Sequence, residues 1–114
     1  MSEKRAVVPR GKMSASERRL RSRLAQLLTQ RGVIRATFLE RRRKCGKANC
    51  RCTRGQEHQS LYLVVSEEGR SRQFYVPKAW VSRVREWVAN YQEARELLEA
   101  VSGIYWDKLR DRQD

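Results

Sequence analysis

LYLVVSEEGRSRQFYV, residues 61–76, holds two short apolar segments on either side of a turn. Residues 61–65 and 72–76 are rich in β-branched and aromatic residues, and SEEGRS between them contains a glycine, which is typical of a hairpin loop. Residues 33–39, VIRATFL, have the same character and lie between a glycine and a run of charges. The sequence therefore predicts three strands, with a cysteine-bearing loop joining the first strand to the hairpin.

Two helices are expected, one before the first strand and one after the last strand in the sequence. Ser14 and Glu17 have the spacing of a capping box, in which the hydroxyl and the carboxylate each bind a free backbone N–H. The helix that they open should end at Gln30, before Gly32. A second helix is expected over residues 78–112, where a split or kink is expected at Gly103. Its apolar positions recur at alternating steps of four and three residues: Trp80, Val84, Trp87, Tyr91, Ala94, Leu98, Val101 and Tyr105.

These elements predict an α+β fold: an N-terminal helix, a three-stranded antiparallel sheet with a zinc-knuckle-like Cys/His loop, and a long C-terminal helix. A chain of 114 residues has room for one compact core. We expect a flexible basic arm over residues 1–13 and a single domain over residues 14–112, with the Cys/His loop at residues 44–59. The apolar stripe of the C-terminal helix is expected to pack on the sheet and the first helix. Its alternative is a seam, over residues 80–105, for a homodimer or a protein partner.

Positive charge is concentrated in the first half of the chain. Residues 1–58 contain 17 Lys+Arg against 4 Asp+Glu, whereas residues 59–114 contain 9 of each, so the whole net charge of +13 belongs to the first half. Arginines outnumber lysines 20 to 6, and the guanidinium group is suited to bidentate contacts with phosphate and guanine. The composition therefore favours a nucleic-acid partner.

The three cysteines and the one histidine lie within fourteen residues, at Cys45, Cys50, Cys52 and His58. Three cysteines and a histidine are a standard ligand set for structural zinc, and four protein donors leave no open position for catalysis. A single residue separates Cys50 from Cys52, where familiar zinc patterns have two to four. Free thiols in a basic loop, or a redox pair, are the alternatives, although no Cys-x-x-Cys motif is present. The sequence predicts a structural zinc site.

The compartment is inferred from the same cysteines. An odd number of cysteines in one loop makes a poor disulfide framework, and no window resembles a signal peptide or a membrane span. A reducing, cytoplasmic location without a membrane partner is therefore expected.

Cations are interleaved with the predicted zinc ligands, and a metal would hold them as fixed donors to phosphates. The candidate nucleic-acid-binding residues in and near this loop are Arg41, Arg42, Arg43, Lys44, Lys47, Arg51 and Arg54. Candidates on the strands are Arg35, Thr37, Arg70, Arg72, Gln73 and Tyr75. The alternation of side chains along a strand places Arg72 on the face opposite to Gln73 and Tyr75, so these residues cannot all contact the same nucleic acid.

CGKANCRCTRGQEH, followed by SLYLVV and RSRQFYVPKAW, resembles a group of small uncharacterised bacterial proteins with a CGK-x-NCRC core. That group has a Tyr-bearing strand and a closing helix, and it is associated with phages and mobile elements. The resemblance covers about residues 32–100 and carries no established activity. In the group a Gly-Pro-Tyr often follows the histidine, whereas Gln59, Ser60 and Leu61 follow His58 here.

The expected function is binding of nucleic acid, with DNA favoured over RNA, by an accessory or regulatory factor of a phage or mobile element. The alternative is a protein-interaction module whose heptad helix docks on a recombinase, a polymerase or another nucleic-acid enzyme. An enzyme is the least supported reading. Glu40, Glu57, Glu67 and Glu68 form no paired acidic motif that would make a metal-assisted nuclease with His58.

Overall fold

A computed structural model describes residues 7–43 and 58–112 of the chain. These residues form two compact units, a sheet unit over Val33–Ala89 and a helical unit formed by Met1–Gly32 with Asn90–Asp114. We describe each unit by itself. That residues 14–112 fold as one domain stays a prediction.

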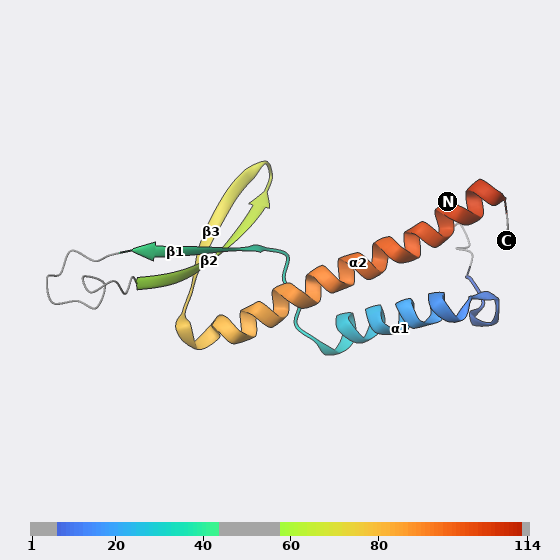
Figure 1. Cartoon of the computed structure of the whole chain (residues 1–114), viewed down its shortest axis with the longest axis horizontal. Coiled ribbons are helices and arrows are strands. Elements are labelled where there is room, and N and C mark those ends of the chain that lie inside the picture. Colours follow the sequence, from blue (N-terminus) through green and yellow to red (C-terminus); the bar gives the residue numbers. More distant parts are fainter. Residues whose placement is uncertain (1–6, 44–57, 113–114) are drawn as a thin grey trace, which may run out of the picture. The chain divides into compact units, whose positions relative to one another are not determined.

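The sheet unit is built on three antiparallel strands in the order β1-β2-β3. Strand β1 is Thr37–Arg43, β2 is His58–Glu67 and β3 is Arg70–Val76, so β2 is central and pairs with both neighbours (Figure 1). The β1–β2 ladder runs from the pair Thr37 and Val64 to the pair Arg43 and His58. The three-stranded antiparallel sheet predicted from the sequence is confirmed.

The β2–β3 turn contains only two residues, Glu68 and Gly69, between the paired residues Glu67 and Arg70. Glu68 has φ 51° and Gly69 has φ 76°. Two consecutive residues with positive φ define a type I′ turn, whose twist matches that of the flanking strands. The hairpin loop is therefore shorter than the six residues expected, and both strands are longer.

The core of the sheet unit lies between one face of the sheet and the start of α2. Its buried residues are Leu61, Leu63, Val76, Val84 and Val88, and the half-buried Phe38 and Trp87 pack against them. The segment before β1 joins this core: the backbone N–H of Ile34 donates a 3.1 Å hydrogen bond to the carbonyl of Trp87. This contact explains why the first strand begins at Thr37 and not at residue 33. The strand then extends through Arg41, Arg42 and Arg43, because β2 provides ladder partners back to His58.

The helical unit begins with the 3-10 turn η1, Arg10–Lys12, and the helix α1, Ala15–Gln30. Ser14 is the N-cap, and its hydroxyl accepts a 3.0 Å hydrogen bond from the backbone N–H of Glu17. The helix ends where predicted, because Arg31 adopts an extended conformation with φ −124° and ψ 152°.

The capping box also predicted that the Glu17 carboxylate binds a free backbone N–H, and this part of the prediction is wrong. The Glu17 carboxylate is 1% exposed and has other partners. Its Oε2 accepts hydrogen bonds from the Arg21 guanidinium at 2.8 Å and from the Tyr105 hydroxyl at 2.9 Å. Burial opposes its ionisation, but the hydrogen bonds from Tyr105 and Arg21 outweigh burial and hold the pKa of Glu17 below its ordinary value. The carboxylate therefore acts between helices.

Helix α2, Val81–Asp111, follows the 3-10 turn η3, Lys78–Trp80, and continues through Gly103, so the expected split is not observed. In the helical unit its later part runs antiparallel to α1 (Figure 1). Arg23 donates two hydrogen bonds to the Glu93 carboxylate, at 2.7 and 3.0 Å, and Asn90 donates one to the carbonyl of Gly32 at 3.0 Å. Within the described ranges, 7–43 and 58–112, neither helix is long and apolar enough to cross a membrane.

Candidate nucleic-acid interface

The predicted zinc ligands lie in, or directly beside, the segment that is outside the described residues. Cys45, Cys50 and Cys52 lie outside the described residues, as do Lys44, Lys47, Arg51 and Arg54, and only the backbone of His58 is described. That backbone pairs with Arg43 at the end of the β1–β2 ladder, so residues 43 and 58 are on adjacent strands. Residues 7–43 and 58–112 contain no cluster of three or more His, Cys, Asp or Glu that could hold a metal ion.

The sheet has a second face, on the side opposite to the core. Alternation along the strands places every second residue there, since Phe38, Leu61, Leu63 and Val76 belong to the core. We call this the outward face, and its described side chains are Thr37, Leu39, Arg41, Ser60, Tyr62, Val64, Ser66, Ser71, Gln73 and Tyr75. None of these ten carries a carboxylate, so none of the described side chains of this face repels a phosphate.

Four side chains meet at the centre of the outward face, one each from β1 and β2 and two from β3. Tyr62 and Tyr75 are directly paired across β2 and β3, and their rings pack edge to face with centroids 5.8 Å apart. The Arg41 guanidinium lies 5.1 Å from the centroid of Tyr62 and donates a 2.8 Å hydrogen bond to the Gln73 side chain. Arg41 thus reaches from β1 across β2 to β3, held by a cation–π contact and a hydrogen bond.

Other predicted contact residues do not join this group. Arg42 and Arg72 occupy strand positions that alternate with the outward ones, as the sequence predicted for Arg72. Arg70 and Arg72 line a hollow together with Glu67 and Glu68, and a guanidinium nitrogen of Arg72 is 3.7 Å from the Glu67 carboxylate. Their positive charge is therefore partly neutralised by neighbours.

Arg35 lies before β1, and its guanidinium donates a 2.9 Å hydrogen bond to the carbonyl of Ser66. Because the acceptor is a neutral carbonyl, the positive charge of Arg35 has no carboxylate partner in the described part of the chain.

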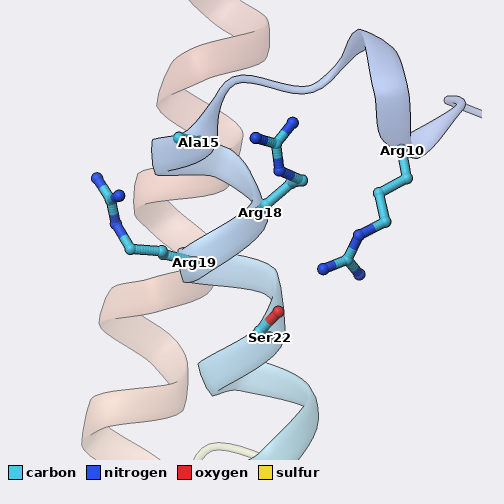
Figure 2. Close-up of a pocket in the computed structure, with 5 residues that line it drawn as sticks. All are labelled: Arg10, Ala15, Arg18, Arg19 and Ser22. Atoms are coloured by element: carbon cyan, nitrogen blue, oxygen red, sulfur yellow. The ribbon is translucent and has the colours of Figure 1, made fainter.

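The helical unit contains a cationic hollow that the sequence analysis did not identify as a site. It has a volume of about 400 Å³ and is lined by Arg10, Ala15, Arg18, Arg19 and Ser22. Figure 2 shows the Arg10 side chain extending from η1 toward α1 and Arg18 extending from α1 toward the connecting segment, while Arg19 points to the other side of the helix. Arg18 also donates a 2.6 Å hydrogen bond to the carbonyl of Met13.

Charge pairing distinguishes the arginines of α1 from one another. Arg21 and Arg23 are bound to the carboxylates of Glu17 and Glu93. Across residues 7–43 and 58–112, Arg10, Arg18 and Arg19 have no such partner within salt-bridge distance. No sequence motif indicates this cluster, because the cluster depends on the turn that brings Arg10 back beside α1.

Comparison with protein families finds one match, over residues 13–86, to a family described as a domain of unknown function, DUF6788. The match covers α1, the three strands and the first residues of α2. No curated protein and no solved structure matches the chain. An uncharacterised family was expected, and since the match spans more than half of the 114 residues, the chain belongs to the DUF6788 family.

Proposed function

We propose that this chain is a small, zinc-stabilised nucleic-acid-binding protein that binds DNA rather than RNA and serves as an accessory or regulatory factor of a phage or mobile element. Its role would be binding and not catalysis. The observation that carries the proposal is that six arginines between residues 10 and 42 have no carboxylate within salt-bridge distance in the described part of the chain, three in the helical unit and three in the sheet unit. They are Arg10, Arg18, Arg19, Arg35, Arg41 and Arg42.

Unpaired arginines are the groups that contribute most to electrostatic binding of nucleic acid. A guanidinium that already faces a carboxylate gains little from a phosphate, whereas an unneutralised one releases a condensed counterion from the nucleic acid when it binds. The further cations of residues 44–54 would add to this set. Arg10 and Arg18 line the same hollow of the helical unit, so a phosphate bound there would lie near two positive charges.

Binding is tested with the full chain and a labelled DNA duplex at low salt, by fluorescence anisotropy. Arg18→Gln removes a charge without a carboxylate partner, and Arg110→Gln removes one that is bound to Asp107 at 3.2 Å. We expect Arg18→Gln to weaken binding several-fold more than Arg110→Gln does. The proposal is wrong if the wild-type chain binds neither duplex nor single-stranded nucleic acid at low salt.

Zinc is proposed on the donor set Cys45, Cys50, Cys52 and His58. Pairing of Arg43 with His58 supports it, because a segment whose two ends are joined by a ladder needs less further ordering to surround an ion. Thiolate ligands need a reducing compartment, so a cytoplasmic location is part of the proposal.

Metal content of protein purified without chelator tests the zinc site. We expect one zinc per chain in the wild type and in Gln59→Ala, a neighbour outside the donor set. Cys50→Ser and His58→Ala should lose the metal and melt at a lower temperature. A wild-type chain without metal would overturn the zinc site and leave the nucleic-acid proposal to be judged on binding alone.

Docking on a protein partner or on a second copy is a second candidate, supported by exposed apolar side chains on α2. Leu98, Trp106 and Leu109 are 58%, 57% and 64% exposed, and their spacing places Leu98 and Leu109 on the same side of the helix. Salt distinguishes the two candidates: nucleic-acid affinity falls steeply with salt, whereas apolar docking is maintained. Sedimentation of the full chain and of Leu98→Gln would show whether this surface joins two copies.

A further inference from the structure

We propose that the outward face of the sheet binds a single-stranded stretch of DNA, whose unpaired bases stack on Tyr75 and on the guanidinium plane of Arg41. This inference rests on the proposed function and adds the form of nucleic acid and the surface that binds it.

Tyr75 provides an aromatic surface that is open to solvent. Its side chain is 56% exposed, and Val76 is the one buried residue of the strand to which it belongs. An edge-to-face contact with Tyr62 supports the ring from one side, at a centroid distance of 5.8 Å and an interplanar angle of 67°. A base that stacks on Tyr75 would therefore meet a ring that is already oriented, so little side-chain entropy would be lost on binding.

Arg41 provides a second flat surface beside it. Its guanidinium lies over the Tyr62 ring and is fixed by the hydrogen bond to Gln73, so one side of its plane is used by the protein. Bases stack on arginine planes as they do on aromatic rings, and the positive charge attracts the phosphates that accompany them. Tyr62, Arg41 and an incoming base would then form consecutive layers.

This chemistry selects unpaired bases over a duplex. In a double helix both faces of every base are covered by its neighbours, and proteins read only the groove edges with polar side chains. At the centre of this face are two tyrosines, which favours stacking. Their neighbours on the outward face are Leu39, Arg41, Ser60, Val64 and Gln73. No carboxylate occurs among the described side chains of the face, so its charge is complementary to a phosphate backbone.

The test uses the full chain with labelled single-stranded oligonucleotides and the matching duplex. Tyr75→Thr removes the ring and keeps a residue suited to a strand, and we expect it to weaken binding of single-stranded DNA roughly 5- to 150-fold, the range for loss of one stacked base. Duplex affinity should change by less than about twofold. Because no charge is removed, the salt dependence of the remaining single-strand binding should be that of the wild type.

Two matched variants separate stacking from folding and from charge. Tyr75→Phe keeps the ring and should bind single-stranded DNA as the wild type does. Arg41→Gln should lower the affinity for single-stranded DNA and also make its salt dependence less steep. Arg72→Gln removes one positive charge from the opposite face, where Arg72 lies beside Glu67, and should have a much smaller effect on both quantities. A melting curve for each variant is the control for folding, and each should show a cooperative transition like that of the wild type.

The outcomes distinguish this inference from the proposed function. If Tyr75→Thr binds single-stranded DNA as tightly as the wild type, the stacking surface is wrong while salt-dependent binding can still stand. Equal losses on duplex and single strand would also overturn it. Tighter binding of single-stranded RNA than of DNA would overturn the choice of DNA. Absence of any nucleic-acid binding by the wild type would overturn both proposals.

Discussion

The hydroxyl of Tyr105 donates a 2.9 Å hydrogen bond to Oε2 of Glu17, joining the end of α2 to the start of α1 across 88 residues of sequence. The same carboxylate oxygen accepts from Arg21, and Arg21 also donates to the Tyr105 oxygen at 3.0 Å. Three side chains therefore close one network in the helical unit. The apolar core of that unit is small, since Leu27 and Ala94 are its buried apolar residues within the described part of the chain.

Tyr105→Phe should destabilise the helical unit. The substitution removes a hydrogen bond to a carboxylate that is 1% exposed, and bonds to charged groups typically contribute about 1.5–3 kcal/mol. Urea denaturation of the variant should show a lower free energy of unfolding by that amount. Trp106→Phe, a change at an exposed neighbouring ring, is the control and should change it little.

Stability should fall on acidification because of Glu17. Its folded pKa is lowered, so the contribution is fully present above the ordinary carboxyl pKa, about 4.3, and is lost as the pH falls through the lower folded value. The hydrogen bond from Arg23 lowers the pKa of Glu93 in the same direction. Melting temperatures measured from pH 7 to pH 3 should therefore decrease below about pH 4.3, and Glu17→Gln should show a shallower decrease. An identical decrease in that variant would exclude Glu17 as a source.

Substitutions at the two turn residues of the hairpin, Glu68 and Gly69, should change the stability of the sheet unit in opposite directions. Gly69 has φ 76°, and alanine there should destabilise the sheet unit by about 1–2 kcal/mol even though an added Cβ meets no atom within 4 Å. Glu68→Asn should stabilise it by a few tenths of a kcal/mol or more, because asparagine tolerates the left-handed region better. Denaturation of both variants gives the signs. A stabilised Gly69→Ala would contradict the type I′ turn.

Gly103 is a glycine inside an unbroken helix. An added Cβ would meet nothing within 4 Å, and glycine costs about 1 kcal/mol relative to alanine in a helix interior. Gly103→Ala should therefore raise the free energy of unfolding by about that amount. Loss of stability would instead indicate that α2 bends or packs closely at this residue.

Local sequence signals predicted the helices and the order of the strands well. The cap at Ser14 and the end of α1 at Gln30 depend on neighbouring residues, as does the apolar period of α2. Strand β1 was placed too early, because the three arginines after Glu40 resemble a loop until the ladder with β2 is known. The strand propensity of these residues alone does not show that β2 pairs with them.

The candidate surfaces were only partly predictable. Alternation along β3 separates Arg72 from Gln73 and Tyr75, and the structure agrees. The contact of Arg41 with Tyr62 and Gln73 required the register of all three strands, and the hollow at Arg10 and Arg18 required the turn η1. Contacts between distant residues are set by tertiary structure, which spacing in the sequence does not record.

The salt dependence of DNA binding tests the central claim most directly. The association constant of the wild-type chain for a DNA duplex is measured by fluorescence anisotropy between about 50 and 200 mM salt. The logarithm of this constant is then plotted against the logarithm of the salt concentration. If four or more of the cations contact phosphates, the affinity should fall with a slope of about −3.6 or steeper. An affinity that does not change with salt, or the absence of detectable binding to both the duplex and its single strands at low salt, would contradict the claim that this chain binds nucleic acid through its arginines.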